Sequence, residues 1–396
     1  MQVHRTADVV VIGGGLTGIM SALRLSRGGA SVIVVDSPLP QARGHIGGFA
    51  RFSGAKFSLP PAGMGLLPVA GSRERLDNTI TSVLQELGFN DCLTQESIDQ
   101  DESHGLVLRR YKSIVLTPSE MDEKIDQLTA KLCKAANIIR GQVQKIENLN
   151  GKWVANYIEP NLSQESVMAN TIFFGGGRLS GDLLLSAGAE PRDAKGIDLG
   201  IRLEFLQKES LSGLRELGPD AKILSGRCRT FCLNHPGHIY HYPFGEFGIP
   251  GGVVAFKEVV TANVGILVRV PNKREILAKI LAAPSQIAKK LAEFGDIITY
   301  GNELIPRELE YIYGEDVCAE LKLFLMQMNE AGLINMKAAH KVHMPLIDWH
   351  WNTFALAKSH KTSLENVFAL GDSSGHARGL LQAAMSGTMA AEEFLC

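Results

Sequence analysis

Residues 8–18 read DVVVIGGGLTG, a strand-like run that passes directly into a turn rich in glycine. The β-branched residues 9–12 predict a strand buried on both faces of a parallel sheet. Residues 19–29 follow with apolar residues at helical spacing, and residues 30–35 (ASVIVV) predict a second strand. Strand, glycine turn, helix and strand in this order are typical of a dinucleotide-binding unit with an α/β fold.

The glycine turn has the spacing needed to hold a pyrophosphate. Gly13 permits the tight turn, Gly15 lets the backbone approach the phosphates, and Gly18 allows the helix to pack closely on the sheet. The helix N-terminus offers unpaired N–H groups and the positive end of its dipole to the phosphates. The other residues expected at the cofactor in this turn are Gly14, Leu16 and Thr17.

An acidic residue ends the second predicted strand. Asp36 is placed to accept hydrogen bonds from ribose hydroxyls, and Ser37 follows it at the same edge of the sheet. A carboxylate at this position disfavours a ribose that carries a 2′-phosphate.

Two further glycine motifs indicate FAD rather than NAD. Gly47 and Gly48 stand in an irregular segment and look like the second glycine pair of large FAD enzymes. Residues 366–372 (NVFALGD) predict a strand that ends in Gly371 and Asp372, and a helix of small residues follows. This pattern resembles the second FAD fingerprint, in which the aspartate holds the ribityl chain and the helix N-terminus stabilises charge on the reduced flavin.

Residues 171–181 (TIFFGGGRLSG) are the only candidate for a second nucleotide site. Their glycines are one residue too far apart for the fingerprint, and no second βαβ unit accompanies them. We interpret the segment as the strand and turn by which the chain returns to the FAD domain, with Gly175 at the cofactor.

Composition excludes several classes of protein. The 396 residues carry a net charge of −2, so nothing global favours nucleic acid or an anionic membrane as a partner. No apolar run is long enough to span a bilayer, and the N-terminus enters the first strand without room for a cleavable signal. Six cysteines are too sparse for a disulfide framework, and their spacing does not suggest zinc. These features predict a cytoplasmic protein without a metal.

Taken together, the motifs resemble the glutathione-reductase-type superfamily of FAD-dependent oxidoreductases, and within it a poorly characterised group of FAD-dependent dehydrogenases. The resemblance covers most of the chain. It rests on VVVIGGGLTG (9–18), FFGGGRLSGDLLLSAGA (173–189), IDLGIRLEF (197–205), RTFCLNHPG (229–237) and NVFALGDSSGHARGLLQAAMSG (366–387). The chain departs from the group in lacking a long N-terminal extension and in having FFGGGR where an Ala-Thr-Gly turn is common.

The resemblance implies a fold and further cofactor contacts. A discontinuous Rossmann-like FAD-binding domain would comprise residues 1–72, 108–190 and 340–396. An inserted α+β substrate or cap domain would comprise residues 73–107 and 191–339. The remaining contacts implied are backbone groups of Val143 at the adenine and of Leu380 and Leu381 at a flavin carbonyl.

Residues 228–242 (CRTFCLNHPGHIYHY) form the densest cluster of titratable side chains. A strand here would place Tyr240 and Tyr242 on one face, as an aromatic wall over the flavin, with His238 or a tyrosine donating protons. Cys232 belongs to the same candidate substrate pocket. The alternatives are an ordinary structural loop, a thiol pair of Cys228 with Cys232, or a metal site, which the neighbouring Pro-Gly and the lack of a second ligand pair disfavour.

His376 and Arg378 complete the catalytic candidates. They stand between Gly371-Asp372 and the following helix, where the similarity to the second FAD fingerprint predicts the pyrimidine edge of the flavin. The alternative for Arg378 is a surface ion pair.

The sequence therefore predicts an FAD-dependent oxidoreductase that transfers a hydride between a small organic substrate and non-covalently bound FAD. One version is an oxidase or dehydrogenase of an amine or alcohol, with oxygen as acceptor. Another is a reductase of an activated double bond, supplied by NAD(P)H or a redox protein. The alternatives are a flavin-binding redox sensor or assembly protein that acts through a partner, and a flavin-dependent nucleic-acid modifier, which the charge balance disfavours.

Overall fold

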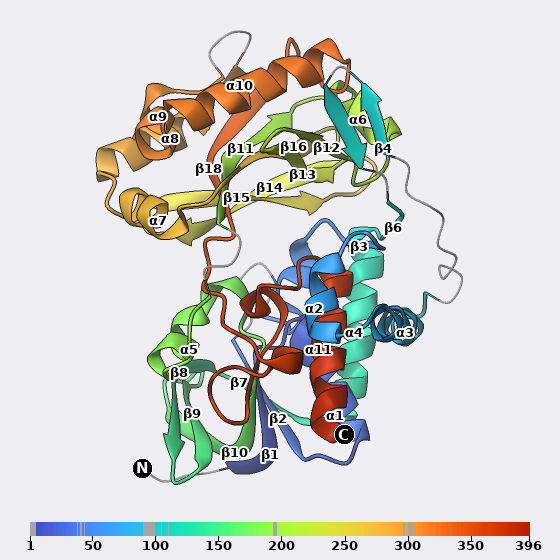
Figure 1. Cartoon of the computed structure of the whole chain (residues 1–396), viewed down its shortest axis with the longest axis vertical. Coiled ribbons are helices and arrows are strands. Elements are labelled where there is room, and N and C mark those ends of the chain that lie inside the picture. The colour runs from blue at the N-terminus through green and yellow to red at the C-terminus, as the bar shows by residue number, and fades with distance from the viewer. Residues whose placement is uncertain are drawn as a thin grey trace.

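The computed structural model describes residues 5–37, 39, 42, 44–89, 100–103, 105–109, 111–192, 196–295, 298–299 and 304–396. These residues form two bodies, each built around its own sheet, which we call the lower and upper body after their places in Figure 1. Cys92 and parts of the expected domain segments lie outside the described residues. None of the described helices is long and apolar enough to cross a membrane.

The lower sheet of the described chain has seven strands. In spatial order they are β7 (Asn137–Arg140), β2 (Val32–Asp36), β1 (Arg5–Ile12), β10 (Gln164–Phe174), β9 (Lys152–Ile158) and β8 (Gln142–Leu149), with β19 (Val367–Ala369) also paired to β10. The pairs among β7, β2, β1, β10 and β19 are parallel, whereas β9 and β8 extend the sheet in antiparallel fashion. This arrangement confirms the predicted Rossmann-like α/β fold.

Strand β1 is buried on both faces, which explains its unbroken apolar run. Val9 and Val11 belong to a core shared with the helices on one side of the sheet. Val10 and Ile12 belong to a second core on the other side, which includes Trp153 of β9. The helices of the first core include α1 (Leu16–Arg27), α2 (Leu67–Ala70), α3 (Arg73–Glu86), α4 (Pro118–Ala135) and α11 (Leu380–Leu395).

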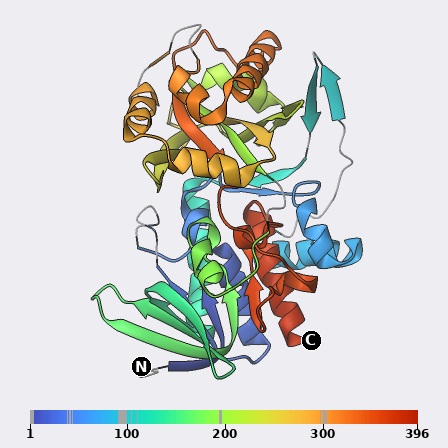
Figure 2. The same ribbon diagram turned by 60° about the vertical axis from the view of Figure 1, so that its left-hand side comes forward.

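The upper sheet has eight strands among the described residues, all in antiparallel pairs. In spatial order they are β17 (Ile298–Thr299), β18 (His340–Asp348), β11 (Ile197–Phe205), β16 (Ala262–Val270), β13 (Cys228–Asn234), β12 (Lys222–Ser225), β5 (Leu106–Arg109) and β4 (Gln100–Ser103). Helices α7 (Lys273–Leu281), α8 (Ser285–Gly295), α9 (Arg307–Tyr313) and α10 (Glu315–Glu330) belong to the same body, as the turned view in Figure 2 also shows.

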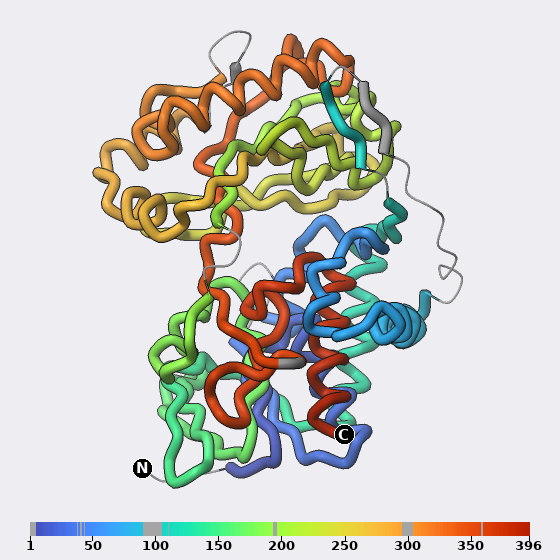
Figure 3. Tube along the Cα trace, viewed as in Figure 1, coloured from blue at the N-terminus to red at the C-terminus, as the bar shows by residue number. Residues whose placement is uncertain are grey.

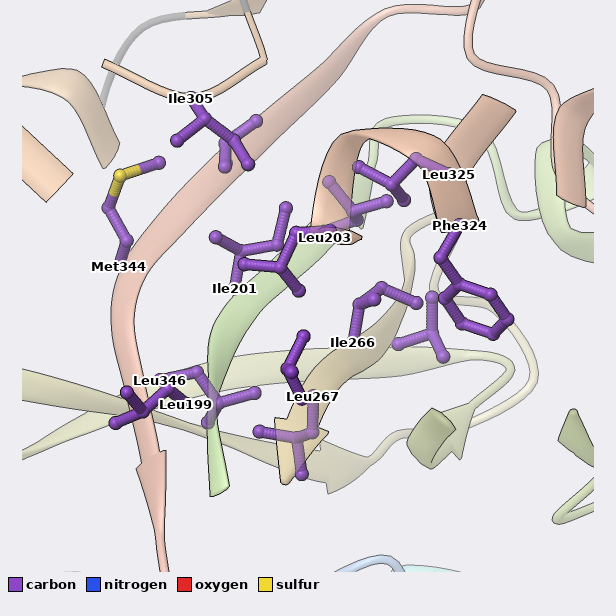
Figure 4. Packing of buried hydrophobic residues seen from close by; sticks show 14 of the residues in the cluster. Leu199, Ile201, Leu203, Ile266, Leu267, Ile305, Phe324, Leu325, Met344 and Leu346 are labelled. Atoms are coloured by element: carbon purple, nitrogen blue, oxygen red, sulfur yellow. The ribbon is translucent and has the colours of Figure 1, made fainter. Parts of the chain in front are cut away.

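The upper sheet presents different chemistry on its two faces. Ile201 and Leu203 of β11 pack with Phe324 and Leu325 of α10 in the apolar core of this body (Figure 4). Between them in sequence, Arg202 points to the opposite face, because side chains alternate along a strand. Arg202 pairs with Gly265 of β16, which pairs in turn with Phe231 of β13. Arg202 and Phe231 thus share the face of the sheet that lines the cavity.

Three segments differ from the expected division into domains. Helix α3 falls in the expected cap segment, but its apolar face packs with α11 in the core of the lower body. Strand β18 and part of β5 fall in the expected FAD-domain segments, but both strands are hydrogen-bonded into the upper sheet. The chain therefore crosses between the bodies at other points, which can be followed along the trace in Figure 3.

Candidate cofactor and substrate site

A cavity of about 570 Å³ lies between the two bodies. From below, its wall includes the glycine turn after β1 and the Gly371-Asp372 segment before α11. From above, it includes Arg202, Lys222 and Phe231 of the upper sheet. One cavity thus joins the phosphate-binding motif to polar side chains of the other body.

Asp36, at the end of β2, has one carboxylate oxygen that makes no hydrogen bond with the described residues. The backbone N–H of Gly14 donates to Oδ1 of Asp36 over 2.6 Å. Its other oxygen, Oδ2, is buried and has no hydrogen-bond partner among the described residues. Burial raises the pKa of Asp36, and the bond from Gly14 opposes that rise. A ribose hydroxyl would satisfy the free oxygen, so the site fits the predicted contact.

The glycine turn leaves space where a pyrophosphate is expected. Gly13 has φ of +98°, a conformation that side chains rarely adopt. Apart from its chain neighbours, no atom of the described residues lies within 4 Å of the position a Cβ of Gly15 would take, and α1 begins there without a side-chain cap. A Cβ on Gly18 would lie 1.9 Å from the carbonyl oxygen of Gly13. Gly15 therefore faces open cavity, whereas Gly18 is needed for close packing.

The N-terminal and C-terminal motifs meet in this cavity. A Cβ on Gly371 would lie 2.8 Å from Oγ1 of Thr17, so the two glycine motifs are in close contact. Gly371 has φ of +58° and opens a 3₁₀ turn, η8 (Gly371–Ser374). The backbone N–H of Gly47 donates to the carbonyl oxygen of Gly14 over 2.8 Å, which attaches the second glycine pair to the first.

The structure brings most of the predicted cofactor residues to the cavity wall. They are Gly13, Gly15, Leu16, Thr17, Asp36, Ser37, Gly47, Gly48, Val143, Gly175, Gly371, Asp372 and Leu380. Three others are not part of the wall. Gly14 lies behind the carboxylate of Asp36, Gly18 lies under the turn, and the side chain of Leu381 is fully buried in the lower core.

The catalytic candidates divide into two groups. Cys232, Tyr240 and Arg378 line the cavity. His238 is exposed and is not part of the wall, so it is no longer a candidate proton donor. His376 is buried outside the wall, and its two ring nitrogens lie 2.9 Å from Nη1 of Arg192 and 2.8 Å from the carbonyl oxygen of Gly65. That position suits a structural contact rather than proton transfer to a ligand.

The two cysteines of the cluster do not form a thiol pair at the cavity. Cys228 is buried in the apolar core of the upper body, where its thiol lies 3.6 Å from the carbonyl oxygen of Glu320. Cys232 lines the cavity and lies within an irregularity in the pairing of β13. Both are free thiols. Among the described residues no group of three or more His, Cys, Asp or Glu side chains is placed to hold a metal.

An aromatic wall stands on strand β14 (Gly237–Phe244), which pairs with β15 (Phe247–Val254). Tyr240 and Tyr242 both line the cavity, and the ring of Tyr240 meets Phe52 edge-on at 5.2 Å between centroids. Burial raises the pKa of both tyrosines. Their hydroxyls are therefore neutral and able to donate hydrogen bonds at physiological pH.

Arg378 holds a buried ion pair at the cavity. Its Nη2 lies 2.7 Å from Oδ1 of Asp348, which is 2% exposed. Burial alone would raise the pKa of Asp348, but Arg378 and then Arg178 and Arg229 outweigh it and hold the pKa at about 2. The surface ion pair considered from the sequence is thus replaced by a buried one.

Arg178 is a cavity residue that sequence reasoning missed. Its guanidinium carbon lies 4.9 Å from the ring of Phe49 and 4.7 Å from that of Trp351, and its Nε lies 3.4 Å from Oδ2 of Asp372. The only local signal was its place directly after the glycines of residues 175–177, in the turn that departs from the usual Ala-Thr-Gly.

A second missed group lies on the upper side of the cavity. Lys56 of β3 (Lys56–Ser58), Tyr111, Asp220 and Lys222 all line it. The hydroxyl of Tyr111 donates to Oδ2 of Asp220 over 2.8 Å, and Nζ of Lys56 lies 3.4 Å from Oδ1 of the same carboxylate. These residues come from distant parts of the chain, so no local sequence motif indicated that they would meet.

Comparison with known proteins supports the cofactor. Residues 8–91 match the family described as FAD binding domain. This segment contains the glycine turn, Asp36 and the Gly47-Gly48 pair, so the predicted FAD cofactor is confirmed. No curated protein matches the chain.

Several solved structures are similar at low identity. A flavoprotein/dehydrogenase from Cytophaga hutchinsonii is 12% identical with a TM-score of 0.49, over 99% of this chain and 78% of that one. A geranylgeranyl bacteriochlorophyll reductase-like protein from Thermoplasma acidophilum is 14% identical with a TM-score of 0.46, over 98% and 77%. The p-nitrophenol 4-monooxygenase of Pseudomonas putida is 14% identical with a TM-score of 0.43, over 99% and 79%. Similarity at this level says nothing about the substrate of this chain.

The cavity geometry and the FAD-binding match together support an FAD-dependent oxidoreductase as the general class. The closer resemblance to glutathione-reductase-type dehydrogenases stays a prediction.

Proposed function

We propose that this chain transfers a hydride between a small organic substrate and non-covalently bound FAD. The observation that carries the proposal is the continuous cavity, which has a dinucleotide cradle at one end and polar side chains of a separate sheet at the other. FAD supplies the redox chemistry when it is bound, so the chain itself needs only to bind, orient and handle protons.

The lower body holds the cofactor in this proposal. The backbone N–H groups at the start of α1 bind the pyrophosphate, and Oδ2 of Asp36 accepts a ribose hydroxyl. Asp372 lies on the wall where the resemblance places the ribityl chain. These contacts fix one end of the cavity and leave the upper sheet to contact the substrate.

The aromatic wall orients the substrate and limits water. Tyr240 and Tyr242 present neutral hydroxyls, and no hydrogen-bond partner for the hydroxyl of Tyr240 is found among the described residues. We assign Tyr240 as the hydrogen-bond donor to the substrate atom that gains or loses a proton as the hydride moves. Cys232 and Arg378 are the other candidates that contact the substrate.

The first experiment is a visible spectrum of the purified protein, followed by anaerobic addition of NADH or NADPH. A flavin that is bleached quickly indicates a reductase with an electron-poor acceptor. A flavin that is untouched indicates an oxidase or dehydrogenase, to be screened with alcohols, amines and amino acids. A colourless protein that cannot be reconstituted with FAD would refute the proposal.

A further inference from the structure

Two cationic side chains of the upper sheet, Arg202 and Lys222, line the cavity. Among the described residues the whole cavity wall carries five cationic side chains and four carboxylates. The cations are Lys56, Arg178, Arg202, Lys222 and Arg378, and the carboxylates are those of Asp36, Asp220, Asp348 and Asp372. Lys56 pairs with Asp220, Arg178 with Asp372 and Arg378 with Asp348, whereas no ion pair of Arg202 or Lys222 is found in the described part of the chain.

Arg202 is a buried charge whose hydrogen-bond partners among the described residues are all neutral. Its side chain is 1% exposed, and its Nη1 donates to Oδ1 of Asn263 over 2.8 Å and to the carbonyl oxygen of Cys232 over 3.2 Å. Its Nε has no hydrogen-bond partner among the described residues. A buried cation without an opposite charge is costly, so the structure calls for an anion nearby.

Lys222 is the second cation that makes no ion pair with the described residues. No hydrogen bond or ion pair to its ammonium group is found among the described residues, and its nearest aromatic neighbour is the Tyr111 ring, 5.9 Å from Nζ. Burial, and then Arg229, lower the pKa of Lys222 to about 8, although the nearby carboxylate of Asp220 opposes this shift. The ammonium is still mostly protonated at neutral pH, and an anion beside it would raise its pKa again.

The two cations lie in one row across the upper sheet. Arg202 is level with Gly265 and Gly265 with Phe231, and the register in which Leu224 pairs with Arg229 extends this row to Lys222. Residues in such a row share a face of the sheet. Phe231 lines the cavity between the two cations, so the row offers charge at both ends and an apolar ring in the middle.

The phosphates of FAD do not explain these charges. The pyrophosphate belongs to the glycine turn at the start of α1, on the lower sheet, where backbone N–H groups bind it. Arg202 and Lys222 stand on the other sheet, at the end of the cavity assigned to the substrate.

We propose that the substrate carries an anionic group, a carboxylate or a phosphate, which binds on the cavity face of the upper sheet with Lys222 as its ion-pair partner. Arg202 adds positive potential from the same row, and Phe231 packs against the carbon skeleton. This proposal rests on the proposed function and narrows its substrate class. A protonated amine without an acidic group would meet the same positive wall and bind poorly.

The test uses the FAD-loaded protein and three probes of similar shape: benzoate, phenyl phosphate and the neutral benzamide. Each is titrated while the visible spectrum of the flavin is followed. We expect the dissociation constant from the spectral titration to be at least tenfold lower for benzoate or phenyl phosphate than for benzamide. Whichever of the two anions binds more tightly identifies the anionic group of the substrate. Lys222→Gln should lower the ratio of the benzamide dissociation constant to the anion dissociation constant at least tenfold. Lys222→Arg should keep most of the native ratio.

Lys289→Gln is the matched control, because Lys289 is on α8 with its side chain 78% exposed. It should leave the anion preference unchanged. The preference of the native protein should fall as the pH rises through about 8, where Lys222 loses its proton. The charged groups that act on Lys222 are Arg229, Asp220, Arg109 and Arg378.

Equal binding of all three probes, no spectral change with any of them, or an unchanged preference in Lys222→Gln would each overturn the anion proposal. If Lys222→Gln changes the reduction potential of the flavin but not the anion preference, the ammonium of Lys222 stabilises the reduced flavin instead of binding the substrate, and the anion proposal also fails. In these cases a bound, reducible flavin leaves the proposed function intact. A protein that cannot bind FAD would overturn both.

Discussion

Gly15 and Gly18 stand three residues apart in the same turn, yet we expect their replacement by alanine to fail in different ways. Gly15 has φ of −68° and ψ of 177°, which alanine adopts readily, and its new methyl group would have no described residue beyond its chain neighbours within 4 Å. The methyl group on Gly18 would lie 1.9 Å from the carbonyl oxygen of Gly13. One change therefore fills cofactor space, and the other forces the backbone apart.

The magnitudes follow from this geometry. For Gly15→Ala, a weaker helix cap is partly offset by a less flexible unfolded chain, so the free energy of unfolding of the apoprotein should change by about 1 kcal/mol or less. The methyl group occupies the expected place of the pyrophosphate, so FAD affinity should fall at least tenfold, which is about 1.4 kcal/mol. For Gly18→Ala, overpacking should lower the free energy of unfolding by about 1–3 kcal/mol or more.

Urea unfolding of the apoproteins measures stability, and FAD titration followed by flavin fluorescence measures affinity. Thr388→Ala in α11 is a control for substitution in the same core, since the hydrogen bond that its Oγ1 donates among the described residues goes to the Ala384 carbonyl oxygen of its own helix. Wild-type FAD affinity in Gly15→Ala, or a larger loss of stability there than in Gly18→Ala, would refute the reasoning.

Three further changes test other parts of the site. Asp36→Ala should weaken FAD binding by about 10- to 100-fold, since it removes charge-assisted hydrogen bonds of about 1.5–3 kcal/mol; an unchanged dissociation constant would contradict the ribose contact. Asp348→Asn should lower the free energy of unfolding in urea at pH 7 by about 3–5 kcal/mol, because it removes the counter-charge of Arg378 in a buried site. The pKa of Asp348 is held at about 2, below its ordinary value, so the stability that its carboxylate gives the folded protein should be complete above about pH 4 and lost as the pH falls toward 2. A free energy of unfolding that is the same in both proteins at pH 7 would count against this ion pair. Tyr240→Phe should keep FAD and slow reduction of the flavin by its donor about tenfold or more in stopped-flow measurements, and an unaltered rate would remove Tyr240 from proton handling.

The cofactor half of the site could be predicted because its residues are close together in sequence. The turn from Gly13 to Gly18 needs a strand before it and a helix after it, and all three are encoded within about twenty residues. Asp36 follows at the end of the next strand for the same local reason. The backbone geometry of the turn and its hydrogen bonds to phosphate and ribose therefore require residues that form a recognisable motif in the sequence.

The substrate half depended on the register of strands that are distant in sequence. Arg202, Phe231 and Lys222 become neighbours only because β11, β16, β13 and β12 pair side by side. Histidines that looked reactive in the sequence face solvent or structural partners instead, as His238 and His376 do. The sequence by itself determined the α/β fold and the FAD cradle, whose chemistry is local to one turn. Only the tertiary structure decided which charges meet at the substrate and which of the described cations make no ion pair, because pairing between distant segments sets both burial and electrostatic balance.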